Sequence, residues 1–121
     1  MRVAYVCADP GVPVFGRKGC SIHVQEVVRS LKAHGVRVDL FAARVDGPPP
    51  PGLDDVALAV LPLNASGDAA ARERAAVRAN HLFRHALALS GPFDAVYERY
   101  SLWSFAGMRF AREAGILGCW K

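Results

Sequence analysis

The feature that most constrains the fold of this chain is an unbroken apolar run that is followed, one loop later, by apolar residues at helical spacing. The run Arg2–Cys7 reads RVAYVC, which predicts a strand buried on both faces. From Ser21 onward the apolar residues instead recur at i, i+3, i+4 and i+7, as Val24, Val27, Val28 and Leu31. Gly35 then predicts the end of this helix. The chain therefore opens with a buried strand, a loop and an amphipathic helix.

The same alternation continues to the end of the chain. Three further strands are predicted at residues 36–42, 56–61 and Ala95–Glu98. Two further helices are predicted over residues 68–90 and 103–114, the second with Trp103 in the core and Gly115 at its end. Right-handed crossovers then give an α/β fold, a Rossmann-like, mostly parallel sheet in the order 3-2-1-4 with helices on both faces. Ligands are expected outside the carboxyl ends of strands 1 and 4, where the winding reverses.

Composition narrows the class of protein. The 121 residues fit one domain, no apolar run approaches the ~20 residues of a membrane span, and the N-terminus does not read as a secretion signal, so we expect a soluble cytoplasmic protein. The three cysteines lack C-x-x-C spacing, which indicates reduced thiols and no metal site. The net charge of +4 is spread along the chain. This pattern argues against nucleic acid and suits an anionic small molecule or, through peripheral contact, an acidic membrane surface.

The loop before the first helix does not match the familiar phosphate-binding patterns. Gly11, Gly16 and Gly19 are spaced five and three residues apart, which does not fit the dinucleotide pattern G-x-G-x-x-G. The P-loop pattern also fails, because Arg17-Lys18 stands where Lys-Ser is required. A flexible glycine ahead of a helix N-terminus still offers free backbone N–H groups to a phosphate. Equally, the glycines need only turn the loop, and Ser21 need only cap the helix.

Two longer stretches together are similar to a known family. These are DPGVPVFGRKGCSIHVQEVVRSLKAHGVRVDLF and, downstream, FDAVYERYSLWSFAGMRFAREAGI. They resemble the N-terminal domain of GT-B-fold, retaining glycosyltransferases of the glycogen-synthase-like group, which includes sucrose and bacterial mannosyl- and glucosyltransferases. The resemblance spans residues 1–116 and implies transfer of a sugar from a nucleotide-sugar donor to a sugar or lipid-linked acceptor, with no further cofactor.

The resemblance assigns roles to individual residues. It places the donor phosphates at Gly16, Gly19, Cys20 and Ser21, and the acceptor at His23, Glu98, Arg99 and Tyr100. For His23 the alternative is a partly buried helix residue, and for Glu98 it is an internal ion pair. The catalytic residues remain unassigned.

The chain also departs from the family. Family members continue into a fifth strand and a second domain that binds the nucleotide sugar, whereas this sequence ends at Lys121. Residues 1–121 are therefore expected to be a partial N-terminal domain, incomplete at its C-terminal edge and inactive alone. The strand Ala95–Glu98 would then be an open edge through which the chain forms homo-oligomers. The alternative function is a stand-alone Rossmann-like module that binds a nucleotide or phosphate without catalysis. An NADP-binding domain using Arg44 is disfavoured by the glycine spacing.

Overall fold

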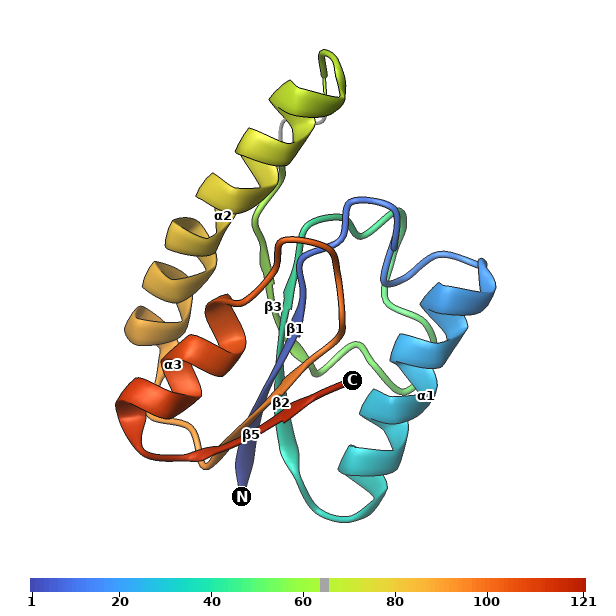
Figure 1. Cartoon of the computed structure of the whole chain (residues 1–121). Helices are drawn as coiled ribbons and strands as arrows, with labels where there is room; N and C mark the ends of the chain where they lie inside the picture. Colours follow the sequence, from blue (N-terminus) through green and yellow to red (C-terminus); the bar gives the residue numbers. More distant parts are fainter. Residues whose placement is uncertain (64–65) are drawn as a thin grey trace.

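A single parallel β-sheet forms the centre of the molecule (Figure 1). The structure is a computed structural model, and it describes residues 1–63 and 66–121. In this part of the chain the strands are β1 (Arg2–Cys7), β2 (Arg37–Ala42), β3 (Ala57–Val60), β4 (Ala95–Glu98) and β5 (Leu117–Trp120). Their order is β3-β2-β1-β4-β5, and each neighbouring pair is parallel. The predicted order of the first four strands is confirmed, and the winding reverses between β1 and β4.

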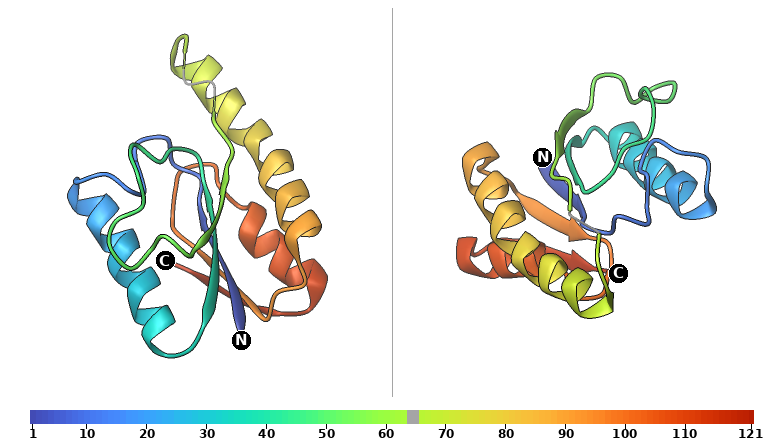
Figure 2. Two further views of the ribbon diagram at one scale, coloured as in Figure 1. Left: turned by 180° about the vertical axis from the view of Figure 1, so that it is seen from behind. Right: turned by 90° about the horizontal axis from the view of Figure 1, so that it is seen from above.

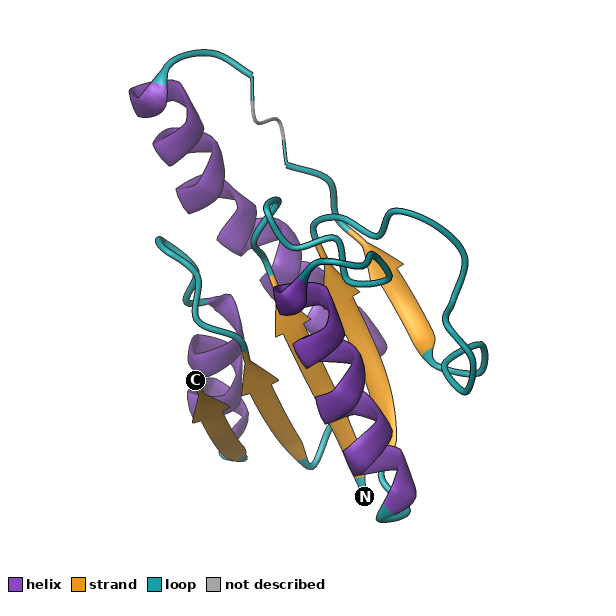
Figure 3. Cartoon of the chain, turned by 90° about the vertical axis from the view of Figure 1, so that its right-hand side faces the viewer, coloured by secondary structure: helices purple, strands orange, loops and turns teal. Residues whose placement is uncertain are grey.

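Helices cover both faces of the sheet, as the sequence predicts. Figures 1 and 3 show α1 (Gly19–Ala33) on one face, and α2 (Ala69–Ser90) and α3 (Ala106–Ala114) on the other. The ends of the helices follow local chemistry: Asp68 accepts a hydrogen bond from the backbone N–H of Ala71 at the start of α2, and Gly115 adopts a left-handed φ of 70° after α3. None of the described helices is long and apolar enough to cross a bilayer.

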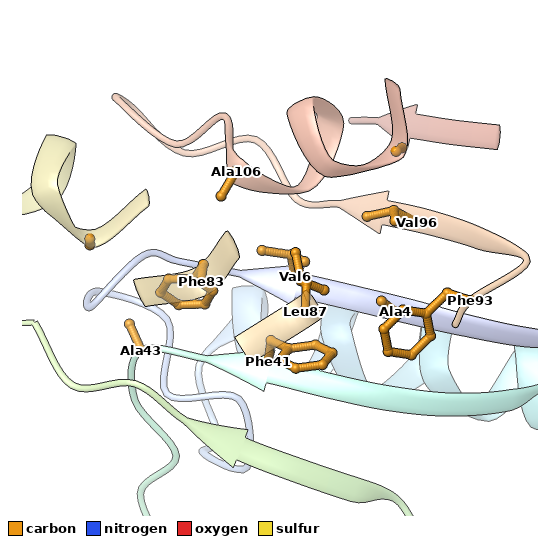
Figure 4. Packing of buried hydrophobic residues seen from close by; sticks show 11 residues of the cluster. Ala4, Val6, Phe41, Ala43, Phe83, Leu87, Phe93, Val96 and Ala106 are labelled. Atoms are coloured by element: carbon orange, nitrogen blue, oxygen red, sulfur yellow. The ribbon is translucent and has the colours of Figure 1, made fainter. Parts of the chain in front are cut away.

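The two faces of the sheet carry separate hydrophobic clusters, because alternate residues of β1 point to opposite sides. Ala4 and Val6 pack with Phe41, Phe83 and Leu87 beneath α2 (Figure 4). The intervening residues Tyr5 and Cys7 pack against the apolar stripe of α1 on the other face. These clusters fix the positions of the strand ends, and thereby of the loops that extend from them.

Two sequence-based expectations are wrong at the C-terminal end. The strand β4 is not an edge, because it pairs with β5 from Ala95 opposite Leu117 to Glu98 opposite Trp120. All four residues of β5 are exposed and one is Gly118, so the strand has no apolar periodicity that the sequence could reveal. Trp103 is not a core residue of α3, since it lies in the preceding loop, is 43% exposed and has a left-handed φ of 72°.

Candidate functional site

The loop between β1 and α1 is held firmly against the rest of the domain. Its backbone pairs with the segment after β2, where the N–H groups of Val14 and Phe15 donate to the carbonyls of Arg44 and Val45. On the other side, the buried amide of Gln25 donates to the carbonyls of Val14 at 2.9 Å and Gly16 at 3.0 Å. The loop therefore reaches the helix N-terminus in one defined path, which is visible from above in Figure 2.

The two glycines of this loop have different roles. A Cβ on Gly16 would come within 2.9 Å of the Pro13 side chain and 3.1 Å of its carbonyl oxygen, so this glycine is required by the turn itself. A Cβ on Gly19 would meet no atom within 4 Å. The backbone at Gly19 therefore faces open space at the first residue of α1, and a ligand could approach it closely.

The first turn of α1 leaves backbone donors without side-chain caps. The helix begins at Gly19, and its N-cap residue Lys18 makes no side-chain capping bond. Ser21 does not cap the helix as expected: it is fully buried, and its hydroxyl has no hydrogen-bond partner. The hydroxyl of Tyr5 in β1 is the other buried side-chain polar atom without a direct hydrogen-bond partner among the described residues that are not solvent-exposed. Arg99 lies beside the Tyr5 hydroxyl and opposes the rise of its pKa, so this hydroxyl has a polar neighbour at the same strand end.

His23 and Arg99 meet at this same end of the sheet. Although they are 76 residues apart in sequence, one guanidinium nitrogen of Arg99 lies 3.1 Å from Nδ1 of His23. A guanidinium only donates, so Nδ1 of His23 accepts and the imidazole is neutral in this arrangement. The backbone N–H of Arg99 donates to the carbonyl of Val6, which anchors the arginine between the ends of β1 and β4. The sequence placed both residues at the site, and the fold brings them into contact.

Glu98 lies in a different environment from the one expected. It is fully buried and faces α3 rather than solvent, with its carboxylate accepting from the hydroxyl of Ser104 at 2.8 Å and from the N–H groups of Gly107 and Met108 at 3.1 and 3.0 Å. It therefore caps the N-terminus of α3. The alternative role expected for Glu98 was an internal ion pair with Arg99. The structure instead pairs its carboxylate with the N-terminus of α3.

Tyr100 continues the chain beyond Glu98 and Arg99 on the exposed side. Its ring packs edge-on against Trp120, with centroids 5.1 Å apart, while more than half of the side chain remains exposed. Its backbone N–H donates to the carbonyl of Lys121. The tyrosine is thus available to solvent beside the end of β5.

The electrostatics of the cluster favour binding over nucleophilic chemistry. Burial raises the pKa of the Cys7 thiol to about 11, although the Asp9 backbone and Arg99 oppose the shift. Burial likewise raises the pKa of the Tyr5 hydroxyl. Both groups are therefore neutral near pH 7, and the cation beside them is Arg99. In the described part of the chain no group of three His, Cys, Asp or Glu side chains is placed to hold a metal ion.

The site is an open surface rather than an enclosed cavity. Two larger depressions, of about 500 and 600 Å³, lie elsewhere, between α2 and α3 and beside the start of β2 and β3. Both are open to solvent, and none of the sequence-predicted site residues lines them. We therefore place the candidate site by its chemistry and not by cavity size.

Sequence reasoning missed two residues that position the loops around the site. Gln25 fixes the loop before α1, and Asn80 fixes the loop after β4 by donating to the carbonyls of Val77 and Trp103 and accepting from the N–H groups of Phe105 and Ala106. Both amides interrupt an apolar helical stripe. A polar amide at a buried helix position is visible in the sequence and indicates a side chain that hydrogen-bonds to a neighbouring segment.

The parallel sheet order and the helices on both faces define a Rossmann-like α/β domain. Two structures of the C-terminal domain of PF1911 hydrogenase from Pyrococcus furiosus share the fold, at 13% and 15% identity and TM-scores of 0.69 and 0.65. Each covers 99% of this chain, which in turn covers 89% and 90% of theirs. MurG from Acinetobacter baumannii, a GT-B glycosyltransferase, also shares the fold, at 15% identity and a TM-score of 0.60. The match covers 98% of this chain and 34% of MurG. No protein-family model and no curated protein sequence matches the chain.

Proposed function

We propose that residues 1–121 act as the N-terminal, acceptor-side domain of a nucleotide-sugar-dependent glycosyltransferase that works with retention. The observation that carries this proposal is the contact between His23 and Arg99 beside the free N-terminus of α1, at the point where the sheet winding reverses. The fold shared with part of MurG supports it at the level of architecture.

In this proposal the start of α1 receives the donor phosphates. The N–H groups of Gly19, Cys20 and Ser21 point from a helix N-terminus, where the helix dipole favours an anion. Gly16 contributes by turning the loop, and Gly19 by leaving room for the phosphate. A leaving diphosphate gains negative charge in the transition state, and preorganised donors of this kind stabilise such charge.

The acceptor lies at the neighbouring strand end. Arg99, His23 and Tyr100 present donors and acceptors suited to sugar hydroxyls, and Arg99 also suits an acidic acceptor. Glu98 acts indirectly, by fixing the start of α3 and thereby the loop that begins with Arg99 and Tyr100.

The test is to titrate the isotopically labelled chain with UDP, GDP and ADP and follow amide shifts by NMR. We expect shifts at residues 16–23 and at Arg99 with at least one of these nucleotides. Gly19→Ala should weaken binding about tenfold or more and leave the fold intact, because its Cβ meets open space. Lys18→Gln is the matched control, since it alters the neighbouring cation without filling that space. Shifts confined to α2 or to residues 46–52 would reject the site.

A second candidate function is a nucleotide- or phosphate-binding module without catalysis. The fold shared with nearly the full length of the PF1911 hydrogenase domain favours a unit of this size. Both functions predict binding of a nucleotide diphosphate, but only the first predicts a sugar acceptor at Arg99 and Tyr100. Saturation-transfer NMR with common mono- and disaccharides, compared between the native chain and Arg99→Gln, separates the two.

A further inference from the structure

The loop between β4 and α3 exposes an unusual number of large apolar side chains. Leu102, Trp103 and Phe105 are 63%, 43% and 42% exposed. Across a groove from Trp103 lies Val77 of α2, which is also exposed. Figure 3 shows this loop standing clear of the sheet beside β5. We call these four residues, Val77, Leu102, Trp103 and Phe105, the apolar tip.

The apolar tip is held in its exposed position by buried polar contacts. Asn80 is buried and makes four hydrogen bonds, three of which tie α2 to the carbonyl of Trp103 and to the N–H groups of Phe105 and Ala106. Trp103 itself has a left-handed φ of 72°, which is unfavourable for a bulky residue. Because the hydrogen bonds of Asn80 fix the backbone at Trp103, the exposure of this side chain is a fixed feature of the fold.

Arginines surround the apolar tip. Arg74 and Arg78 of α2 line the same groove as Trp103, and the guanidinium of Arg109 lies 5.7 Å from the ring centroid of Phe105. Arg112 lines a second, separate depression together with Phe105 and Arg109. The acids nearby are Glu73, which shares the groove with Trp103, and Glu113, which pairs with Arg84 and Arg109. The surface therefore combines apolar side chains with a surrounding excess of positive charge.

We propose that the apolar tip docks the domain onto an anionic lipid surface. Tryptophan favours the headgroup level of a bilayer, leucine and phenylalanine enter the acyl boundary, and arginines bind lipid phosphates. A protruding loop suits a deformable bilayer, whereas a protein partner would need a complementary pocket. This inference does not rest on the proposed glycosyltransferase function, because the apolar tip is made of other residues than the candidate site.

The chain contains two tryptophans, so Trp120→Phe leaves Trp103 as the single fluorescent reporter. We expect this variant to bind vesicles of phosphatidylcholine with phosphatidylglycerol more tightly than vesicles of phosphatidylcholine alone. Binding should shift Trp103 emission to the blue, allow quenching by brominated acyl chains, and weaken as salt is added. A chain that stays in solution with both kinds of vesicle would overturn the proposal.

Matched variants test each component. Leu102→Ser should weaken vesicle binding about tenfold, and Arg74→Gln and Arg78→Gln about fivefold each. The controls are Leu89→Ser, at an exposed leucine near the far end of α2, and Arg37→Gln, at the opposite end of the sheet. Circular dichroism verifies that each variant is folded. Equal losses in variants and controls, or a blue shift with an acidic protein but not with lipid, would reject docking on a membrane.

Discussion

Two buried amides, Gln25 and Asn80, determine the paths of the two loops that flank the end of β1. Each replaces an apolar residue in a helical stripe and uses its polar atoms on loop backbone. A buried carbonyl that loses its donor costs about 1–3 kcal/mol, so such residues hold a loop more firmly than apolar packing alone. The candidate site and the apolar tip are therefore built on preorganised backbone.

At Gln25 this leads to a direct prediction. Gln25→Met keeps the side-chain size but removes both hydrogen bonds to the carbonyls of Val14 and Gly16. We expect the free energy of unfolding to fall by about 1–3 kcal/mol in urea titrations. The control Glu26→Gln, on the exposed side of the same helix turn, should change it by less than about 0.5 kcal/mol, because it breaks a surface ion pair with Arg29. Similar values for the two variants would contradict the role of Gln25.

Cys7 should be chemically inert in the folded chain. Burial raises its pKa to about 11 from an ordinary value of 9.0, and the thiolate is the reactive form. At pH 8 we expect iodoacetamide to modify the exposed Cys119 rapidly and Cys7 only after urea unfolding, as measured by mass spectrometry. Rapid native modification of Cys7 would show that the strand end is open.

The same shift predicts a pH dependence of stability. Between about pH 9 and 11 the unfolded chain releases the Cys7 proton while the folded chain retains it, so stability falls as pH rises. The urea midpoint should therefore be lower at pH 10 than at pH 8, and Cys7→Ala should make this difference smaller. A midpoint that rises with pH would contradict the assignment.

At the scale of elements, α3 depends on a residue outside itself. The helix has nine residues, too few to be stable alone, and two of its first N–H groups bond to Glu98 at the end of β4. Glu98→Gln places an amide N–H₂ among these donors. We expect a loss of about 2–3 kcal/mol in the free energy of unfolding, against a small change for Glu113→Gln at the exposed end of the helix. A Glu98→Gln variant with unchanged stability would contradict this capping role and favour the expected role of Glu98 in ligand binding.

Most helices and strands could be predicted from the sequence, because burial of one face or both faces of an element determines the spacing of its apolar residues. The bounds of β1 and β4 agree with the prediction, and α1 and α3 end at the predicted glycines, Gly35 and Gly115. The strand β5 could not be predicted, because it is exposed and contains a glycine, Gly118, that packs closely against Met108 and Ala111. The left-handed backbone of Trp103 also leaves no mark in a hydrophobic pattern.

The candidate site was predictable in part for a related reason. The family resemblance put His23 and Arg99 in one group, and the fold brings them into contact because α1 starts beside the ends of β1 and β4, where the winding reverses. The direction of a side chain at a strand end depends on the partners that the next element offers it. The carboxylate of Glu98 turns toward α3 because the first N–H groups of that helix need acceptors. This direction could not be predicted from the sequence pattern around Glu98.

At the scale of the whole molecule, the position of β5 predicts self-association. Its four residues are exposed, including Leu117 at 70%, and its outer edge has no partner strand among the described residues. We propose that two copies pair there, and that sedimentation velocity over a concentration series will show a growing dimer. Leu117→Lys should return the chain to a monomer, whereas Leu89→Lys on α2 should not. A native chain that remains monomeric at high concentration would reject this contact.

The central place of β1 sets the order in which the domain can form during its own synthesis. Arg2 to Cys7 are translated before both of their neighbouring strands, β2 and β4, and the N–H of Arg2 bonds to Asp94, 92 residues later. At ribosomal rates of ~5–20 residues per second, the second neighbour emerges after the first strand by on the order of 5 to 20 seconds. During that time the edge of β1 that later pairs with β4 has no partner strand, and β2 is its strand neighbour on the other side.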